Sequence, residues 1–173
     1  MKKLMVVLMV LSMATIANAT LTFTISGPTQ LATGAVGVYT VGYSLSPGWG
    51  ILSTDHDITG TLGTIGGGVI LTTNRDTALD FISISPVSGN YQIAICNDIL
   101  GTNLGSPLFS FQFTAGSQTG TATLVMLDNG ATYDLNWGPF TDSVMGTLNV
   151  QITPEPMSLG LLGLGGLFLR RRK

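Results

Sequence analysis

Apolar and polar residues alternate along most of the chain between residues 20 and 153. In residues 108–114, Phe109, Phe111 and Phe113 fall on one face, and polar residues share the other. Successive side chains of a strand point to opposite faces of its sheet. The pattern therefore predicts a half-buried antiparallel strand whose phenylalanines belong to the core.

Similar segments recur along this region, separated by Gly- or Pro-rich turn signals. They span residues 21–25, 36–41, 69–73, 81–85, 91–96, 108–114, 121–127 and 144–152. Glu and Lys, which are good helix formers, are absent between residues 20 and 153, whereas Thr, Val, Ile and Ser are abundant. Eight or nine strands at this spacing predict an all-β fold, an antiparallel β-sandwich of the immunoglobulin-like or jelly-roll type.

The first 19 residues have the three parts of a secretory signal peptide. Two lysines precede an apolar run over residues 4–17, and Ala17 and Ala19 stand at positions -3 and -1 of a cleavage site. We therefore expect signal peptidase to release a chain that begins at Thr20 and works outside the inner membrane.

The last twenty residues are typical of a second sorting signal. Pro154, Glu155 and Pro156 precede an apolar, Gly-rich run over residues 157–169, and the sequence ends on four cations: Arg170, Arg171, Arg172 and Lys173. As a helix the apolar run reaches about 20 Å, against roughly 30 Å of hydrocarbon in a bilayer. This favours transient membrane contact with the cations on the cytoplasmic side, and a permanent tail anchor is the alternative.

This order of parts resembles a PEP-CTERM sorting signal. The resemblance implies processing by an exosortase, a membrane-embedded cysteine protease of Gram-negative bacteria that produce exopolysaccharide. It also implies a final location at the cell surface, in the outer envelope or in the extracellular matrix. The expected organisation is a signal peptide over residues 1–19, a β-sandwich over residues 20–153 and a sorting signal with a short hydrophobic helix over residues 154–173.

The strands of the body resemble those of cohesin-like modules. The resemblance rests on the opening strand at residues 21–25, the strand that begins at Gly34, the pair at residues 108–114 and 120–124, and the closing strand at residues 146–152. Cohesins are β-sandwiches related to carbohydrate-binding modules, and they bind dockerins in cell-surface assemblies that degrade carbohydrates. The resemblance therefore implies a dockerin-bearing protein as a partner.

The charge of the body excludes one large class of partners. Between residues 20 and 153 the chain has eight Asp and one Arg, with no Lys and no Glu. Such a surface cannot neutralise a phosphate backbone, so nucleic acid is excluded as a partner. The lone Cys96 is interpreted as a small buried residue of the strand at residues 91–97, with intermolecular pairing as the alternative.

The body offers little for acid–base or nucleophilic catalysis. His56 is the only histidine, and we interpret it as a loop residue between two solvated aspartates, Asp55 and Asp57. If the segment is instead a strand, the aspartates point away from the face of His56. Without Glu in the body, paired carboxylates would have to come from Asp alone. The sequence thus predicts a structural or adhesive module rather than an enzyme.

Calcium is the one cofactor that a motif suggests. Asp55, Asp57 and Thr59, followed by Gly60, copy the first half of a calcium-binding loop, but its twelfth position is Gly66 instead of Glu. A second acidic turn follows Asp128, at Asn129 and Gly130. The alternative is that Asp and Asn simply build tight turns here.

Two tryptophans suggest a carbohydrate ligand. Trp49 and Trp137 stand in Gly- and Pro-rich segments, and Tyr133 and Asp134 are close to the second in sequence. Aromatic rings can stack on sugar rings while Asp binds hydroxyl groups, so extracellular polysaccharide is a candidate ligand. The alternative is that both tryptophans cap the ends of the core.

Overall fold

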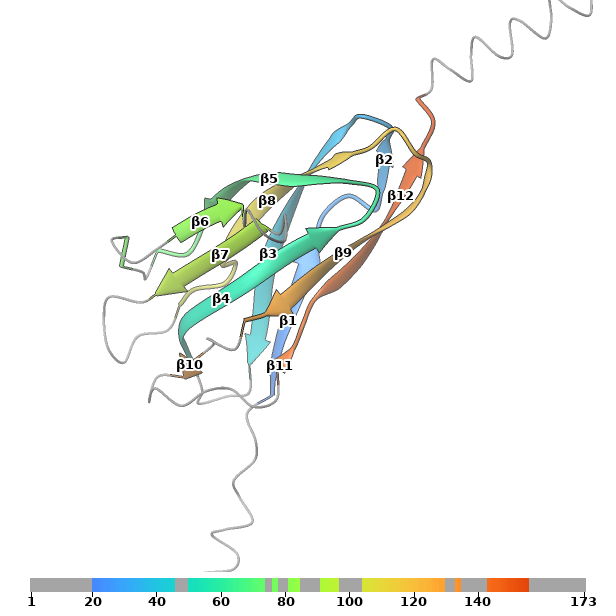
Figure 1. Cartoon of the computed structure of the whole chain (residues 1–173). Coiled ribbons are helices and arrows are strands. Elements are labelled where there is room, and N and C mark those ends of the chain that lie inside the picture. Colours follow the sequence, from blue (N-terminus) through green and yellow to red (C-terminus); the bar gives the residue numbers. More distant parts are fainter. Residues whose placement is uncertain are drawn as a thin grey trace, which may run out of the picture.

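Two packed β-sheets form the body of the protein (Figure 1). The computed structural model describes residues 20–45, 50–73, 76–77, 81–84, 91–96, 104–129, 133–134 and 143–155. Residues 1–19, predicted as a signal peptide, and residues 156–173, predicted as part of a sorting signal, lie outside the described residues. Within the described ranges, no helix is long and apolar enough to cross a membrane.

The first sheet has five strands in the order β11, β1, β3, β8, β5. Their bounds are β1 Leu21–Ser26, β3 Val36–Leu45, β5 Gly63–Ile70, β8 Phe109–Ala115 and β11 Ser143–Val144. β3 runs antiparallel to both β1 and β8, and β8 runs antiparallel to β5. The short β11 adds to β1 in parallel.

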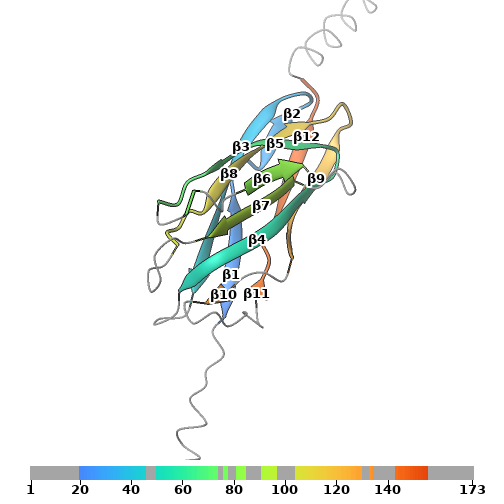
Figure 2. The same ribbon diagram turned by 60° about the vertical axis from the view of Figure 1, so that its left-hand side comes forward.

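The second sheet has the order β2, β12, β9, β4, β7, β6, and β10 also pairs with β4. The bounds are β2 Gln30–Ala32, β4 Ile51–Gly60, β6 Phe81–Ile84, β7 Tyr91–Cys96, β9 Gly120–Asp128, β10 Tyr133–Asp134 and β12 Thr147–Thr153. Figure 2 shows β6, β7 and β4 side by side on this sheet. The body is therefore an all-β sandwich, as the sequence predicts.

The inward faces of the two sheets form one hydrophobic core. Phe109, Phe111 and Phe113 of β8 are fully buried, and Ser110 and Gln112 lie on the other face, which confirms the prediction for this strand. From the opposite sheet the core receives buried residues of β4, β7, β9 and β12: Leu52, Ile58, Tyr91, Ile93, Ile95, Ala122, Leu124, Met126, Val150 and Ile152.

Three sequence-based strand boundaries are wrong. Residues 51–60, where no strand is predicted and His56 is interpreted as a loop residue, form the long strand β4. The glycines at 66–68, interpreted as a turn signal before the strand at 69–73, lie within β5 at a bulge. The single strand predicted at 144–152 is two strands, β11 and β12, which belong to different sheets. A chain that changes sheets needs a break, and Met145 and Gly146 supply it.

The start of β1 and the end of β12 lie at opposite poles of the sandwich (Figure 1). β1 begins beside β11, and β12 ends beside β2. At that second pole the Thr33 amide donates to the Thr153 carbonyl at 2.9 Å, and the Thr153 hydroxyl donates to the Leu31 carbonyl at 3.4 Å. The folded strand therefore ends at Thr153, and Pro154 and Glu155 are exposed beyond it.

Candidate functional site

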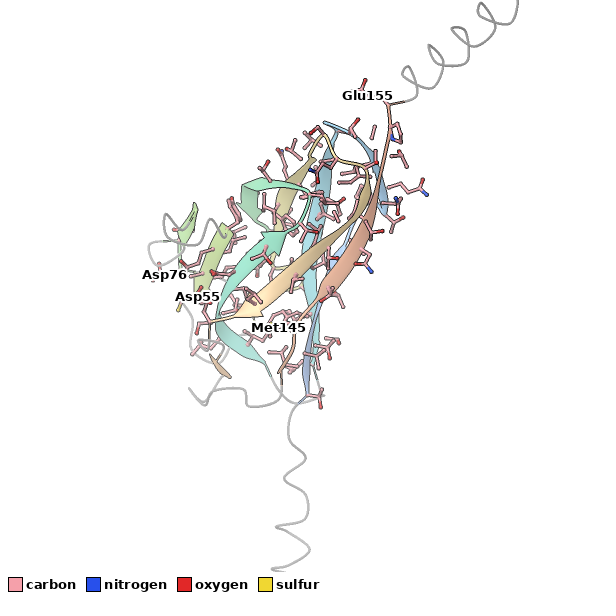
Figure 3. The ribbon with its side chains drawn as sticks, turned by 45° about the vertical axis from the view of Figure 1, so that its right-hand side comes forward. Asp55, Asp76, Met145 and Glu155 are labelled. Atoms are coloured by element: carbon pink, nitrogen blue, oxygen red, sulfur yellow. The ribbon has the colours of Figure 1, made fainter. Side chains whose placement is uncertain are left out.

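The outer face of β4 and its neighbours carries the most distinctive group of polar side chains in the described residues. Because β4 is a strand, Asp55, Asp57 and Thr59 share its outer face, and all three are half-buried. Figure 3 shows Asp55 at the side of the sandwich nearest β7, away from Glu155, which lies at the pole where β12 ends. Asp57 lies opposite Gln92 of β7.

Two amide side chains hold the carboxylates in place. Gln92 Nε2 donates to both carboxylate oxygens of Asp55, at 3.1 and 3.2 Å. Asn129, just after β9, donates from Nδ2 to Asp55 Oδ1 at 3.2 Å and to Asp57 Oδ1 at 3.0 Å. We call these four residues, Asp55, Asp57, Gln92 and Asn129, the carboxylate–amide cluster. Hydrogen bonds to ionised groups are the stronger kind, so the cluster has a defined geometry before any partner arrives.

Apolar side chains border the carboxylate–amide cluster. Leu127 of β9 is paired with Asp57 across the strands and is 42% exposed, while Ala94 of β7 is paired with Asp55. A fixed polar group beside exposed apolar surface is typical of a face that binds another protein. On the far side of β9, Thr121 and Thr123 donate to side chains of β12 at 3.1 Å each, so the uncharged polar surface continues there.

His56 does not belong to this surface. It is fully buried among core residues, its ring packs edge-on against Phe23 with centroids 4.4 Å apart, and its Nε2 is hydrogen-bonded to the Thr54 hydroxyl. The interpretation of His56 as a loop histidine is wrong, because β4 alternates its side chains and turns His56 inward. The two flanking aspartates point away from it, as the strand alternative predicts.

The predicted calcium ligands do not form a loop. Residues 55–60 are extended, and a strand advances about 3.3 Å per residue, so Asp55 and Thr59 are separated by about 13 Å. Calcium ligands must approach the ion to within about 2.6 Å, so these three residues cannot share one ion. Within the described part of the chain, no group of three or more His, Cys, Asp and Glu side chains is placed to hold a metal.

Sequence reasoning missed Gln92, and it grouped Asn129 with Asp55 and Asp57 only as a second acidic turn. The signal for Gln92 is its place on the outward face of the strand at 91–96, where it stands among small side chains. The contact of Asn129 with both carboxylates could not be read from sequence, because more than 70 residues separate it from each. Only the pairing of β4 with β9 brings them together.

The structure describes only some of the remaining predicted site residues. Tyr133 and Asp134 form β10, which pairs with β4 at Ser53 and Ile51, and their side chains are not described. Outside the described residues lie Trp49, Trp137, Ala17, Ala19, Pro156 and the four terminal cations. Glu155 lines a shallow depression at its pole, together with Thr33, Gly34, Ala115, Gly116 and Ser117.

Cys96 is half-buried, whereas the prediction is a buried residue of its strand. Tyr91, Ile93 and Ile95 of β7 face the core, so the alternation places Cys96 on the outer face with Gln92 and Ala94. At this end of the strand, the Cys96 carbonyl accepts a hydrogen bond from the Asp76 amide at 2.7 Å.

The sequence matches no protein-family model, and it matches no curated protein. Similarity is found instead at the level of structure. A cohesin module from a family 33 glycoside hydrolase of Clostridium perfringens superposes with a TM-score of 0.61 at 12% identity, over 78% of this chain and 98% of the module.

Two further cohesins give similar values. The seventh ScaB type I cohesin of Pseudobacteroides cellulosolvens has a TM-score of 0.59 at 14% identity, over 79% of this chain and 93% of its own. The sixth cohesin of scaffoldin B of Acetivibrio cellulolyticus, solved in complex with a Cel5 dockerin, has a TM-score of 0.57 at 14% identity, over 80% of this chain and 100% of its own. The body of this protein therefore has a cohesin-like β-sandwich fold.

Proposed function

We propose that this chain is an exported, non-enzymatic module of the bacterial cell surface or extracellular matrix with a structural or adhesive role. The observation that carries the adhesive part is the carboxylate–amide cluster, whose two carboxylates are held on the outer face of the second sheet beside exposed Leu127. Export is supported by the parts of the two terminal segments, residues 1–19 and 154–173. Signal peptidase and an exosortase-type protease of a Gram-negative envelope are then its processing partners.

The position of His56 supports a role without catalysis. Any mechanism that needs an imidazole must use this residue, because the chain has no other histidine. His56 is fully buried and faces away from Asp55 and Asp57, so neither solvent nor a substrate reaches its ring beside those carboxylates. The two aspartates remain as acceptors of hydrogen bonds, which is what a recognition surface requires.

The binding partner that fits the cluster is a protein with hydroxyl, amide or cationic donors. The carboxylates accept such donors, and Leu127 adds apolar contact at the same place. One structural neighbour, the sixth cohesin of scaffoldin B, was solved with a dockerin bound. A dockerin-bearing protein is therefore the specific partner that we propose.

A binding experiment with paired variants tests this proposal. The chain from Thr20 is immobilised and presented with a purified dockerin module, with and without Ca²⁺. We expect saturable binding that Asp57→Asn weakens by roughly tenfold or more, because it removes a fixed charge from the contact. Glu155→Gln removes one carboxylate at the other pole and should leave the affinity unchanged. Equal affinities for both variants would place the contact elsewhere, and absence of binding would exclude the dockerin.

A second candidate function is the binding of extracellular polysaccharide by the two tryptophan-bearing segments. The described residues that flank these segments meet at one pole: Leu21 is paired with both Leu45 and Ser143, and Ile51 is paired with Asp134. This places the attachment points of both segments at one end of the sandwich. Polysaccharide should then quench tryptophan fluorescence, and Trp137→Ala should abolish the effect without changing dockerin binding. Tryptophan fluorescence that polysaccharide leaves unchanged would exclude this candidate.

A further inference from the structure

The outer face of the first sheet carries no charge, in contrast to the face that holds the carboxylate–amide cluster. The five strands β1, β3, β5, β8 and β11 contain no Asp, Glu, Lys, Arg or His. Their outward residues are mostly Thr, Ser, Val and Gly. In a body with eight Asp and one Arg, such a surface has a distinct chemical character.

Three valines project from this face. Val36 and Val38 of β3 are 54% and 58% exposed, and Val69 of β5 is 55% exposed. β8 lies between these two strands and presents Ser110, Gln112 and Thr114 outward. Exposed apolar side chains that gather on one sheet face indicate an interaction surface.

Gly66 gives a second, independent sign that something approaches this face. A Cβ added at Gly66 would meet no atom within 4 Å, and its φ is not in the left-handed region. The contacts within the chain therefore do not require glycine at this position, although glycine weakens a strand by about 0.5–1 kcal/mol. A glycine inside a strand marks either a bulge or a place where another backbone or ligand comes close. The bulge lies between Gly66 and Val69, and its left-handed residue is Gly67, so the backbone conformation does not require glycine at Gly66.

The register of the three strands makes the face complementary to itself. Val38 and Gly66 are both paired with Gln112, from opposite sides of β8, so the three residues lie at one level. Thr40 and Val69 are likewise both paired with Ser110. If two copies stack these faces around a two-fold axis that runs parallel to β8 and midway between the sheets, β3 of one copy lies over β5 of the other. The projecting Val38 of one copy would then face the bare Gly66 of the other.

We propose that this face binds a second copy of the chain, with the two sheets stacked about 10 Å apart around a two-fold axis near Gln112. The charge of the body favours this occupant, because two acidic molecules approach each other best through a face without charge. The outward positions of β1, β3, β5 and β8 hold no aromatic ring for stacking on a sugar and no cation for binding an anion. The proposal concerns the face opposite the carboxylate–amide cluster and does not depend on the function proposed above.

Disulfide crosslinking in the full chain, exported by its own host, tests the pairing. Gln112→Cys is made in a Cys96→Ser background, and Asn149→Cys, exposed on the other sheet, is the matched control. A residue near a two-fold axis meets its own counterpart, so we expect at least about tenfold more disulfide-linked dimer from Gln112→Cys than from the control. Similar yields from both variants would overturn the proposal.

A second pair of variants separates assembly from folding. Gly66→Glu adds a charge where the structure leaves space, so the fold should persist while the Gln112→Cys crosslink is lost. Thr24→Glu adds the same charge on the exposed part of β1 and should leave the crosslink intact. Circular dichroism and thermal unfolding check that both variants fold. A crosslink that survives Gly66→Glu in a folded chain would exclude this interface.

Discussion

At the scale of single residues, β4 places neighbouring polar side chains in two environments, the core and the outer face of the sheet. Thr54 and His56 of β4 face the core, and Asp55 and Asp57 face outward and are held by Gln92 and Asn129. A buried imidazole needs a polar neighbour, and the Thr54 hydroxyl supplies one. Four polar residues in succession therefore satisfy two different environments.

Tyr39 is the residue whose ionisation should affect stability. It is fully buried, stacks on Phe111 with centroids 5.6 Å apart, and donates its hydroxyl hydrogen bond to the Pro28 carbonyl at 3.0 Å. Burial raises the pKa of Tyr39 above its ordinary value of 10.0, because the phenolate is poorly solvated there. The folded chain then holds this proton more tightly than the unfolded chain does.

The sign of the effect follows from proton linkage. The stability that Tyr39 contributes is complete below pH 10 and is lost as pH rises above it, where the unfolded chain releases the proton first. Tyr39→Phe should cost about 1 kcal/mol at pH 7 through the lost hydrogen bond, and its unfolding free energy should fall less steeply above pH 10. Urea unfolding at several pH values measures both. Parallel alkaline slopes in the two proteins would show that Tyr39 does not titrate in this way.

At the scale of elements, β5 depends on glycine for two different reasons. A Cβ at Gly63 would overlap the Thr114 carbonyl oxygen and the Phe113 ring, so the close approach of β5 to β8 requires glycine there. Gly67 has a φ of 59° at the bulge, and the Gly68 amide donates to the Tyr91 hydroxyl at 2.6 Å. The bulge is thereby tied to the opposite sheet.

Alanine at two positions of β5 should have opposite effects. Gly63→Ala should lower the free energy of unfolding by about 1–3 kcal/mol, since a backbone oxygen must move. Gly66→Ala meets open space and should leave stability unchanged or raise it by about 0.5 kcal/mol. Thermal and urea unfolding at low protein concentration distinguish the two. A Gly66→Ala variant as unstable as Gly63→Ala would contradict the packing described for this strand.

At the scale of the whole molecule, the start of β1 and the end of β12 lie at opposite poles. A body attached through its C-terminal segment would present the pole with β10 and β11 away from the point of attachment. The outer faces of the two sheets would stand along the sides, where one can bind a partner protein and the other a second copy.

Processing at both ends can be tested by intact mass. Protein extracted from the cell surface should begin at Thr20 and should lack the hydrophobic segment after Pro156, because both terminal segments carry the features of cleavable signals. Ala17→Leu should block the first cleavage, since the -3 position requires a small residue. Recovery of a full-length C-terminus embedded in the membrane would favour the tail anchor instead.

The sequence by itself determined the all-β class, the strands at 21–25 and 91–96 and the burial of the β8 phenylalanines. Each of these depends on local alternation, which one face of one strand decides. Tertiary structure decided the identity of β4, because polar residues on both of its faces hide the alternation. Tertiary structure also decided which residues form the carboxylate–amide cluster, and it placed Val38 and Gly66 at the same level of the first sheet. Strand pairing alone joins these residues, which are distant in the chain.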